Sequence, residues 1–118
     1  MVKKILIIDD DPEIVSYLKD VFQEVGYATV SARDGVEGIE MAQVHAPDLI
    51  TLDMEMPARG GALFYVKLRQ EPRLADIPVV IISGAPSSAL AVGKGVPVLT
   101  KPIDPAKTLR VVKEMLGD

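Results

Sequence analysis

Five short segments of mainly apolar residues recur along the chain, separated by longer stretches in which apolar and polar residues mix. The clearest of these segments are continuous and rich in β-branched side chains, which is typical of strands buried on both faces of a sheet. The predicted strands are residues 5–8, 28–32, 49–52, 79–82 and 96–100, of which 28–32 has the weakest pattern.

Apolar residues between the strands fall at helical spacing. The clearest case follows the first strand, where Pro12 opens the predicted helix, Asp11 is its expected N-cap and Gly26 stops it. Asp104 and Pro105 predict the start of a last helix in the same way. The other predicted helices cover residues 35–44 and 61–70. Strands that alternate with helices indicate right-handed βαβ units and a parallel sheet, so the sequence predicts an α/β fold.

Length and composition narrow the class of protein. The chain has 118 residues, of which 48% are hydrophobic, so we expect one domain over residues 1–118 with a substantial core. It has no cysteine and a single histidine, His45, which we expect at the surface; disulfides and metal sites built from cysteine or several histidines are excluded. The net charge of −4, with scattered basic residues, argues against nucleic acid binding by this domain. No apolar run approaches the length of a membrane span or a signal peptide core, so the expected location is the cytoplasm, without a membrane partner.

Polar side chains stand at the carboxyl ends of four predicted strands. They are Asp9, Asp10 and Asp11 after the first strand, Asp53 after the third, Ser83 after the fourth and Lys101 after the fifth. In an open parallel sheet, ligands bind beyond these ends, so we expect the groups to converge on one edge. Adjacent carboxylates repel one another, which makes a run of three unfavourable unless it has a function.

The converging groups fit the chemistry of phosphoryl transfer. Carboxylates without a nearby histidine or cysteine suit Mg²⁺, which commonly takes one or two carboxylates together with waters and phosphate oxygens. A lysine and a hydroxyl can contact an arriving phosphoryl group, and one carboxylate can act as the nucleophile and form an aspartyl phosphate. Asp11 is the weakest candidate for this site, because the start of a helix already explains it.

Four motifs, in this order along the chain, resemble the response regulator receiver domain of two-component signalling, the family that includes the chemotaxis regulators. The motifs are IIDDDPEI at 7–14, PDLITLDMEMPARGG at 47–61, IPVVIISGA at 77–85 and LTKPID at 99–104. The resemblance covers nearly the whole chain and implies a flavodoxin-like fold, with a five-stranded parallel sheet in the order 2-1-3-4-5 and helices on both faces. The alternation of strands and helices alone does not fix this order.

The resemblance also implies which residues bind Mg²⁺. Asp53 matches the phosphoacceptor, which is also a metal ligand, and Asp10 matches the acidic residue that binds the metal directly. Asp9 matches its neighbour in the acidic pair, with an indirect role. Glu55 matches the position whose backbone carbonyl completes the metal site; its side chain could face the site or the solvent.

Three further positions match residues that meet the phosphoryl group. Ser83 matches the hydroxyl residue that contacts the group and moves on activation, and Lys101 matches the phosphoryl-contacting lysine. Gly84 matches the small residue that leaves the phosphoryl group accessible. By the same likeness, the bond between Lys101 and Pro102 is expected to be cis, which is the minor form for such bonds in general.

These matches predict a phosphorylation-dependent switch in a phosphorelay. A phosphohistidine on a sensor kinase or a phosphotransfer protein would donate to Asp53 with Mg²⁺, and the charge added would act on an unknown downstream target or output domain. The domain would promote only its own phosphorylation and dephosphorylation, and so would not be a turnover enzyme.

Three alternatives belong to other classes of protein. The chain could be a receiver-like interaction scaffold that does not switch. It could be a Mg²⁺-dependent phosphatase with an aspartyl nucleophile, although such enzymes typically carry an aspartate where Glu55 stands. It could bind flavin, although only 4% of its residues are aromatic and no phosphate-binding loop follows the first strand.

The chain departs from the family pattern in two places. Ser83 and Lys101 are 18 residues apart, which is shorter than usual, and the missing residues belong to the fourth helix. The segment 84–97 holds three glycines and two prolines, so we expect a shortened helix confined to about residues 87–92. Val98 stands where the family commonly has an aromatic residue. Both departures concern the usual output face and leave the phosphorylation chemistry intact.

Overall fold

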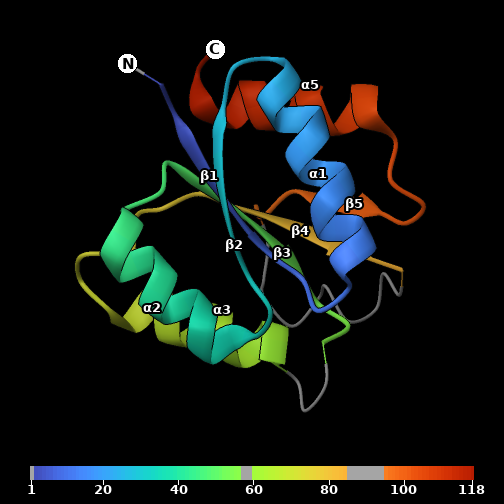
Figure 1. Ribbon diagram of the computed structural model, residues 1–118. Helices are drawn as coiled ribbons and strands as arrows, with labels where there is room; N and C mark the ends of the chain where they lie inside the picture. Colours follow the sequence, from blue (N-terminus) through green and yellow to red (C-terminus); the bar gives the residue numbers. More distant parts are fainter. Residues whose placement is uncertain (1, 57–59, 85–94) are drawn as a thin grey trace.

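The computed structural model describes residues 2–56, 60–84 and 95–118. Five strands form one parallel sheet in the order β2-β1-β3-β4-β5, with helices on both faces (Figure 1). The strands are β1 (Lys4–Ile8), β2 (Ala28–Ala32), β3 (Leu49–Asp53), β4 (Val79–Ser83) and β5 (Val98–Thr100). The helices are α1 (Pro12–Glu24), α2 (Gly35–His45), α3 (Gly60–Gln70) and α5 (Pro105–Leu116). The expected flavodoxin-like α/β fold is confirmed, including the strand order.

Two hydrophobic clusters hold the helices on the sheet. Helices α1 and α5 cover one face, and α2 and α3 cover the other (Figure 1). Alternate residues of β1 belong to different clusters. Ile5 and Ile7 pack against α1 and α5, whereas Leu6 and Ile8 pack against α2 and α3. Because β1, β3 and β4 are covered on both faces, their apolar runs are continuous, as the sequence pattern predicted.

The helix starts follow local sequence signals. The Asp11 side chain accepts a hydrogen bond of 2.9 Å from the Glu13 N–H, and Pro12 occupies the first turn of α1. The Asp104 side chain caps α5 in the same way, accepting from the N–H groups of the second and third residues that follow it. Each cap satisfies backbone donors that have no partner inside the helix, so both predicted N-caps are confirmed.

The fifth strand is shorter than expected. The sequence pattern predicted residues 96–100, whereas β5 begins at Val98. Pro97 has no N–H to donate to the sheet, and its carbonyl only accepts a hydrogen bond of 2.8 Å from the Ile81 N–H. The expected fourth helix at about residues 87–92 lies outside the described residues. The bond between Lys101 and Pro102 is cis, as the family likeness implied.

One glycine fixes how closely α3 approaches the end of β3. A Cβ atom on Gly61 would lie 2.7 Å from the Asp53 carbonyl oxygen and 2.9 Å from the Met54 Cα, so any side chain would force the helix away. The start of α3 is therefore packed directly against the strand end that carries Asp53. Among the residues that the structure describes, no helix has both the length and the apolar character needed to cross a membrane.

Candidate functional site

Three carboxylates meet at the carboxyl edge of the two central strands. Asp9 and Asp10 follow β1, and Asp53 ends β3, its neighbour in the sheet. One oxygen from each of the three side chains lies within 4.8 Å of the other two. Asp9 and Asp53 are each only 2% exposed, whereas Asp10 is open to solvent. Because the two strands are parallel and in register, sequence positions more than 40 residues apart deliver their charges to one point.

Asp9 has one hydrogen-bonded side-chain oxygen and one that lacks a partner among the described residues. Its Oδ1 accepts a hydrogen bond of 2.9 Å from the Asp11 N–H, but its buried Oδ2 has no hydrogen-bond partner among the described residues. Burial raises the pKa of Asp9 to about 6; the Asp11 amide opposes the rise, and the charge of Asp53 adds to it. A buried carboxylate oxygen without a donor is unfavourable, so this geometry suits a cation.

Asp53 is held by an ammonium group and a backbone amide. The Nζ atom of Lys101 lies 3.2 Å from Asp53 Oδ1, and the Glu55 N–H donates to the same oxygen at 3.0 Å. Partial burial by itself lowers the pKa of Lys101, but the hydrogen bond and charge of Asp53, with smaller contributions from Asp9 and Glu55, outweigh it and raise the pKa. Lys101 therefore stays protonated beside the carboxylates at neutral pH.

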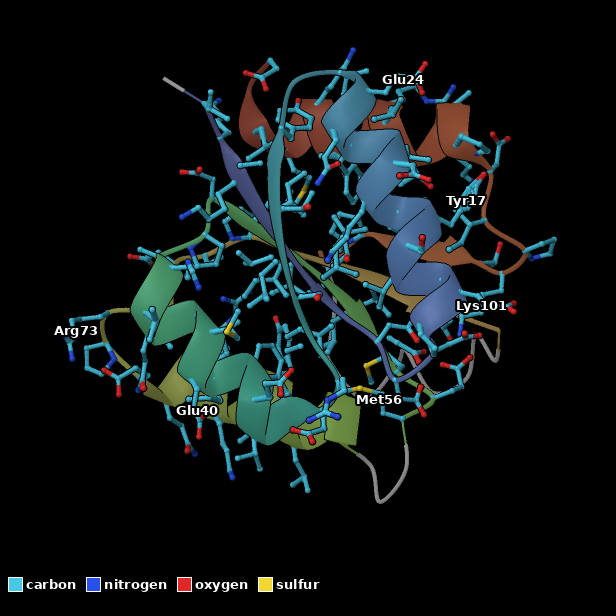
Figure 2. The ribbon with its side chains drawn as sticks, viewed as in Figure 1. Tyr17, Glu24, Glu40, Met56, Arg73 and Lys101 are labelled. Carbon is cyan, nitrogen blue, oxygen red and sulfur yellow. The ribbon has the colours of Figure 1, made fainter. Side chains whose placement is uncertain are left out.

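The end of β4 brings Ser83 and Gly84 to the same edge. Ser83 is fully buried, and its carbonyl accepts a hydrogen bond of 2.9 Å from the Lys101 N–H. The Gly84 N–H donates to the Glu55 carboxylate, so this side chain turns toward β4 and not into solvent. Figure 2 shows Lys101 at the end of the molecule where α1 begins. The structure thus places Ser83, Gly84, Lys101 and Glu55 together with the acidic cluster.

Asp11 and His45 do not belong to the cluster of side chains at this edge. The side-chain oxygen Oδ1 of Asp11 is used by the Glu13 N–H, which supports its role as a cap and not as a metal ligand. His45 is half-buried at the end of α2 and lies far from this edge of the sheet. The sequence could not predict the contact between Glu55 and Gly84, because it joins two strand ends that no local motif links.

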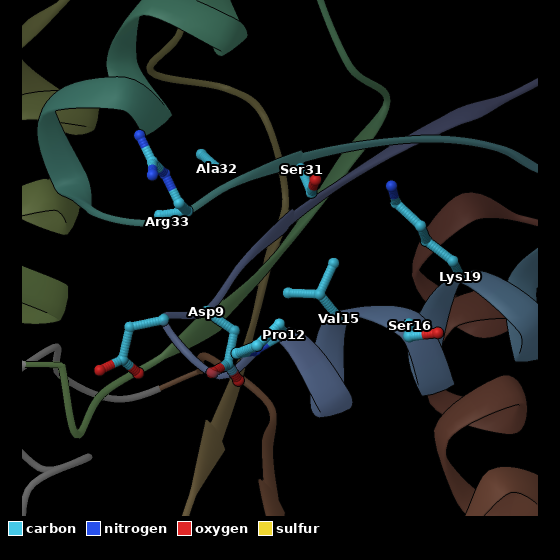
Figure 3. Close-up of a pocket in the computed structure, with 9 residues that line it drawn as sticks. Asp9, Pro12, Val15, Ser16, Lys19, Ser31, Ala32 and Arg33 are labelled. Atoms are coloured by element: carbon cyan, nitrogen blue, oxygen red, sulfur yellow. The ribbon is translucent and has the colours of Figure 1, made fainter.

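A hollow of about 530 Å³ opens beside the acidic pair (Figure 3). It runs from Asp9 along the first turns of α1 to Lys19, and across to Arg33, which directly follows β2. The sequence analysis did not single out Lys19 or Arg33, which lie on separate elements with no shared motif. Asp9 and Asp10 line the hollow, so a hydrated cation can approach the acidic pair through it.

Comparisons with known proteins agree with this geometry. Residues 5–113 match the family described as the response regulator receiver domain. The chain is 34% identical over 117 residues to Protein Rrf1 of Nitratidesulfovibrio vulgaris, covering 99% of this chain and 85% of Rrf1. The solved receiver domain of a signal transduction histidine kinase from Syntrophus aciditrophicus is 30% identical, with a TM-score of 0.88 and coverage of 98% and 91% of the two chains. Vibrio cholerae chemotaxis protein CheY4 is 26% identical, with a TM-score of 0.87 over 98% and 99% of the two chains. The chain therefore belongs to the response regulator receiver domains, the two-component signalling domains that accept phosphoryl groups on an aspartate.

Proposed function

We propose that this receiver domain is a phosphorylation-dependent switch whose phosphoacceptor is Asp53. The observation that carries the proposal is the position of Asp53 between an ammonium group and an acidic pair: Lys101 Nζ lies 3.2 Å from its Oδ1, and oxygens of Asp9 and Asp10 lie within 4.8 Å of its carboxylate. Receiver domains interact with sensor histidine kinases and phosphotransfer proteins, and we assign the phosphoryl donor to a phosphohistidine on such a partner.

The donor set fits Mg²⁺. The three clustered carboxylates offer only oxygen ligands, and the buried Asp9 Oδ2 has no hydrogen-bond partner among the described residues. Asp10 and Asp53 would hold the ion directly, the Glu55 backbone carbonyl would complete the protein's share, and Asp9 would act indirectly. When bound, Mg²⁺ supplies positive charge that neutralises the carboxylates and the oxygens of the transferring group.

The remaining chemistry belongs to residues of the chain. A carboxylate oxygen of Asp53 attacks phosphorus, forming an O–P bond as the N–P bond of the phosphohistidine breaks; the electron pair stays on the imidazole nitrogen, which takes a proton from solvent. The Lys101 ammonium orients Asp53 beforehand and faces the negative charge of the phosphoryl oxygens. Gly84 carries no side chain that could block the approach.

The switch follows from the added charge. A phosphoryl group adds roughly −1.5 to −2 charges at neutral pH. It arrives beside the Lys101 ammonium and the acidic cluster. The Ser83 hydroxyl and the Lys101 ammonium are the groups that would move toward it. Because the Ser83 carbonyl is bonded to the Lys101 N–H, a shift at the end of β4 also displaces the end of β5.

Incubation with acetyl phosphate, with and without Mg²⁺, tests the proposal by intact mass. The mass of one phosphoryl group should be gained only when Mg²⁺ is present. No gain under either condition would favour the interaction scaffold that keeps the fold without switching. A gain that does not need Mg²⁺ would contradict the proposed metal site.

A further inference from the structure

The Glu55 carboxylate lies at the phosphorylation site although the family likeness gives a role only to its backbone. Its Oε1 accepts a hydrogen bond from the Gly84 N–H, and a Cβ atom placed on Gly84 would lie 3.3 Å from the same oxygen. The Glu55 N–H meanwhile donates to Asp53 Oδ1 at 3.0 Å. One residue therefore contacts the phosphoacceptor through its backbone and the end of β4 through its side chain.

The amide that Glu55 occupies is next to the Lys101 side chain. A Cβ on Gly84 would lie 3.8 Å from Lys101 Cδ and 3.9 Å from its Cβ, and the Nζ of the same lysine is 3.2 Å from Asp53. Two of the donor–carboxylate contacts at this edge therefore lie side by side: the Lys101 ammonium with Asp53, and the Gly84 N–H with Glu55. In addition, the charge of Glu55 contributes to the raised pKa of Lys101.

An anionic group on Asp53 disturbs both pairs. Its oxygens need hydrogen-bond donors, and the Gly84 N–H at the end of β4, beside the Lys101 side chain, is already used by another anion. The Glu55 carboxylate and the anionic group on Asp53 also repel each other, and partial burial of the site strengthens this repulsion. Glu55 is exposed, so its side chain has solvent to turn into when it leaves the Gly84 N–H.

We infer that the Glu55 carboxylate competes with phosphoryl-like anions for the Gly84 N–H. It holds the Gly84 N–H while Asp53 is unmodified, and it must leave when an anionic group arrives on Asp53. The consequence is a site with weakened affinity for the phosphoryl group, in which departure of Glu55 frees the Gly84 N–H at the end of β4. This inference rests on the proposed function and specifies how the same site is regulated.

The affinity for beryllium fluoride, a phosphoryl mimic, tests the competition in the presence of Mg²⁺. We compare wild type, Glu55→Gln and the matched control Glu13→Gln by calorimetry; Glu13 lies in the first turn of α1, so the control removes one exposed charge near the same edge. Glu55→Gln should bind the mimic roughly tenfold more tightly, because a charge-assisted hydrogen bond no longer has to be broken. Glu13→Gln should leave the affinity nearly unchanged, because exposed charges are screened.

The Gly84 amide resonance reports the contact independently of binding. In wild type its proton should lie downfield, as expected for a bond to a carboxylate, and it should move upfield in Glu55→Gln without any ligand. Equal affinity of wild type and Glu55→Gln, or weaker binding by the variant, would overturn the inference and leave the proposed function standing. Failure of every protein to bind the mimic would overturn the proposed function, and the competition with it.

Discussion

Asp9 is the residue at which the unfavourable electrostatics of the site are concentrated. It is 2% exposed, one of its oxygens has no partner among the described residues, and its neighbours Asp10 and Asp53 carry the same charge. Lys101 offsets only part of this, since it makes its direct contact with Asp53. Without a metal ion, the ionised form of Asp9 therefore opposes folding.

Asp9→Asn should change how stability depends on pH. Burial raises the pKa of Asp9 from 3.8 to about 6, so between these values the folded protein binds more protons than the unfolded chain. The contribution of Asp9 to stability is consequently present below about pH 4 and is lost as the pH rises through 6, by at most about 3 kcal/mol. Urea unfolding without Mg²⁺ from pH 4 to 8 should show the variant gaining on wild type as the pH rises. A constant difference between the two proteins would contradict the raised pKa.

Lys101→Ala should strengthen Mg²⁺ binding and lower the stability of the metal-free protein. The lysine is the cation that faces Asp53, so its removal leaves the carboxylates uncompensated and should destabilise the protein without metal by about 1–2 kcal/mol. The same change removes a charge that competes with the metal. Thermal unfolding across a Mg²⁺ titration should show a larger rise in Tm than in wild type, and exposed Lys107→Ala serves as the control. An equal or smaller rise would mean that Lys101 does not oppose the metal.

At the scale of elements, prediction from sequence succeeded where the signal is local. The caps Asp11 and Asp104 and the stop at Gly26 each act within one turn of the residues they affect, so the sequence alone located these helix ends. The predicted length of β5 was wrong by two residues, because Pro97 has no N–H for the sheet and the pairing with β4 begins only at Val98. The strand order came from family likeness, since alternation does not say which strands are neighbours.

Removing the cap of α5 should have a measurable effect on stability. The Asp104 carboxylate accepts hydrogen bonds of 3.0 and 3.4 Å from the N–H groups of Ala106 and Lys107. Asp104→Ala should lower the free energy of unfolding by about 1 kcal/mol, the usual effect of losing an N-cap. Chemical denaturation measures this, with exposed Asp76→Ala as the control. Equal stability of the two variants would show that the cap contributes nothing beyond an ordinary surface aspartate.

At the scale of the whole molecule, the site exists only because four strands end together. The motifs placed Asp9, Asp10, Asp53, Ser83 and Lys101 at strand ends, and a parallel sheet brings such ends to one edge whatever the details of packing. What the sequence could not supply was the direction of the Glu55 side chain, which depends on the Gly84 amide that the β4 strand end presents. Contacts between separate strand ends are set by the assembled fold.

A second polar cluster lies at the opposite end of the sheet. Lys3 Nζ donates to the Leu116 carbonyl at 2.5 Å and lies 3.0 Å from Asp118, whose other oxygen accepts a hydrogen bond of 2.7 Å from the Tyr27 hydroxyl. These contacts tie the end of α5 to β1 and to the turn before β2.

The most direct test of the account is to locate the phosphoryl group after treatment with acetyl phosphate and Mg²⁺. Wild type, Asp53→Asn and the control Asp20→Asn, an exposed aspartate on α1, are compared by intact mass. Only a carboxylate can form the acyl phosphate, so wild type and the control should gain one phosphoryl group and Asp53→Asn should gain none while remaining folded. A full gain of mass by folded Asp53→Asn would contradict the assignment of Asp53 as the phosphoacceptor.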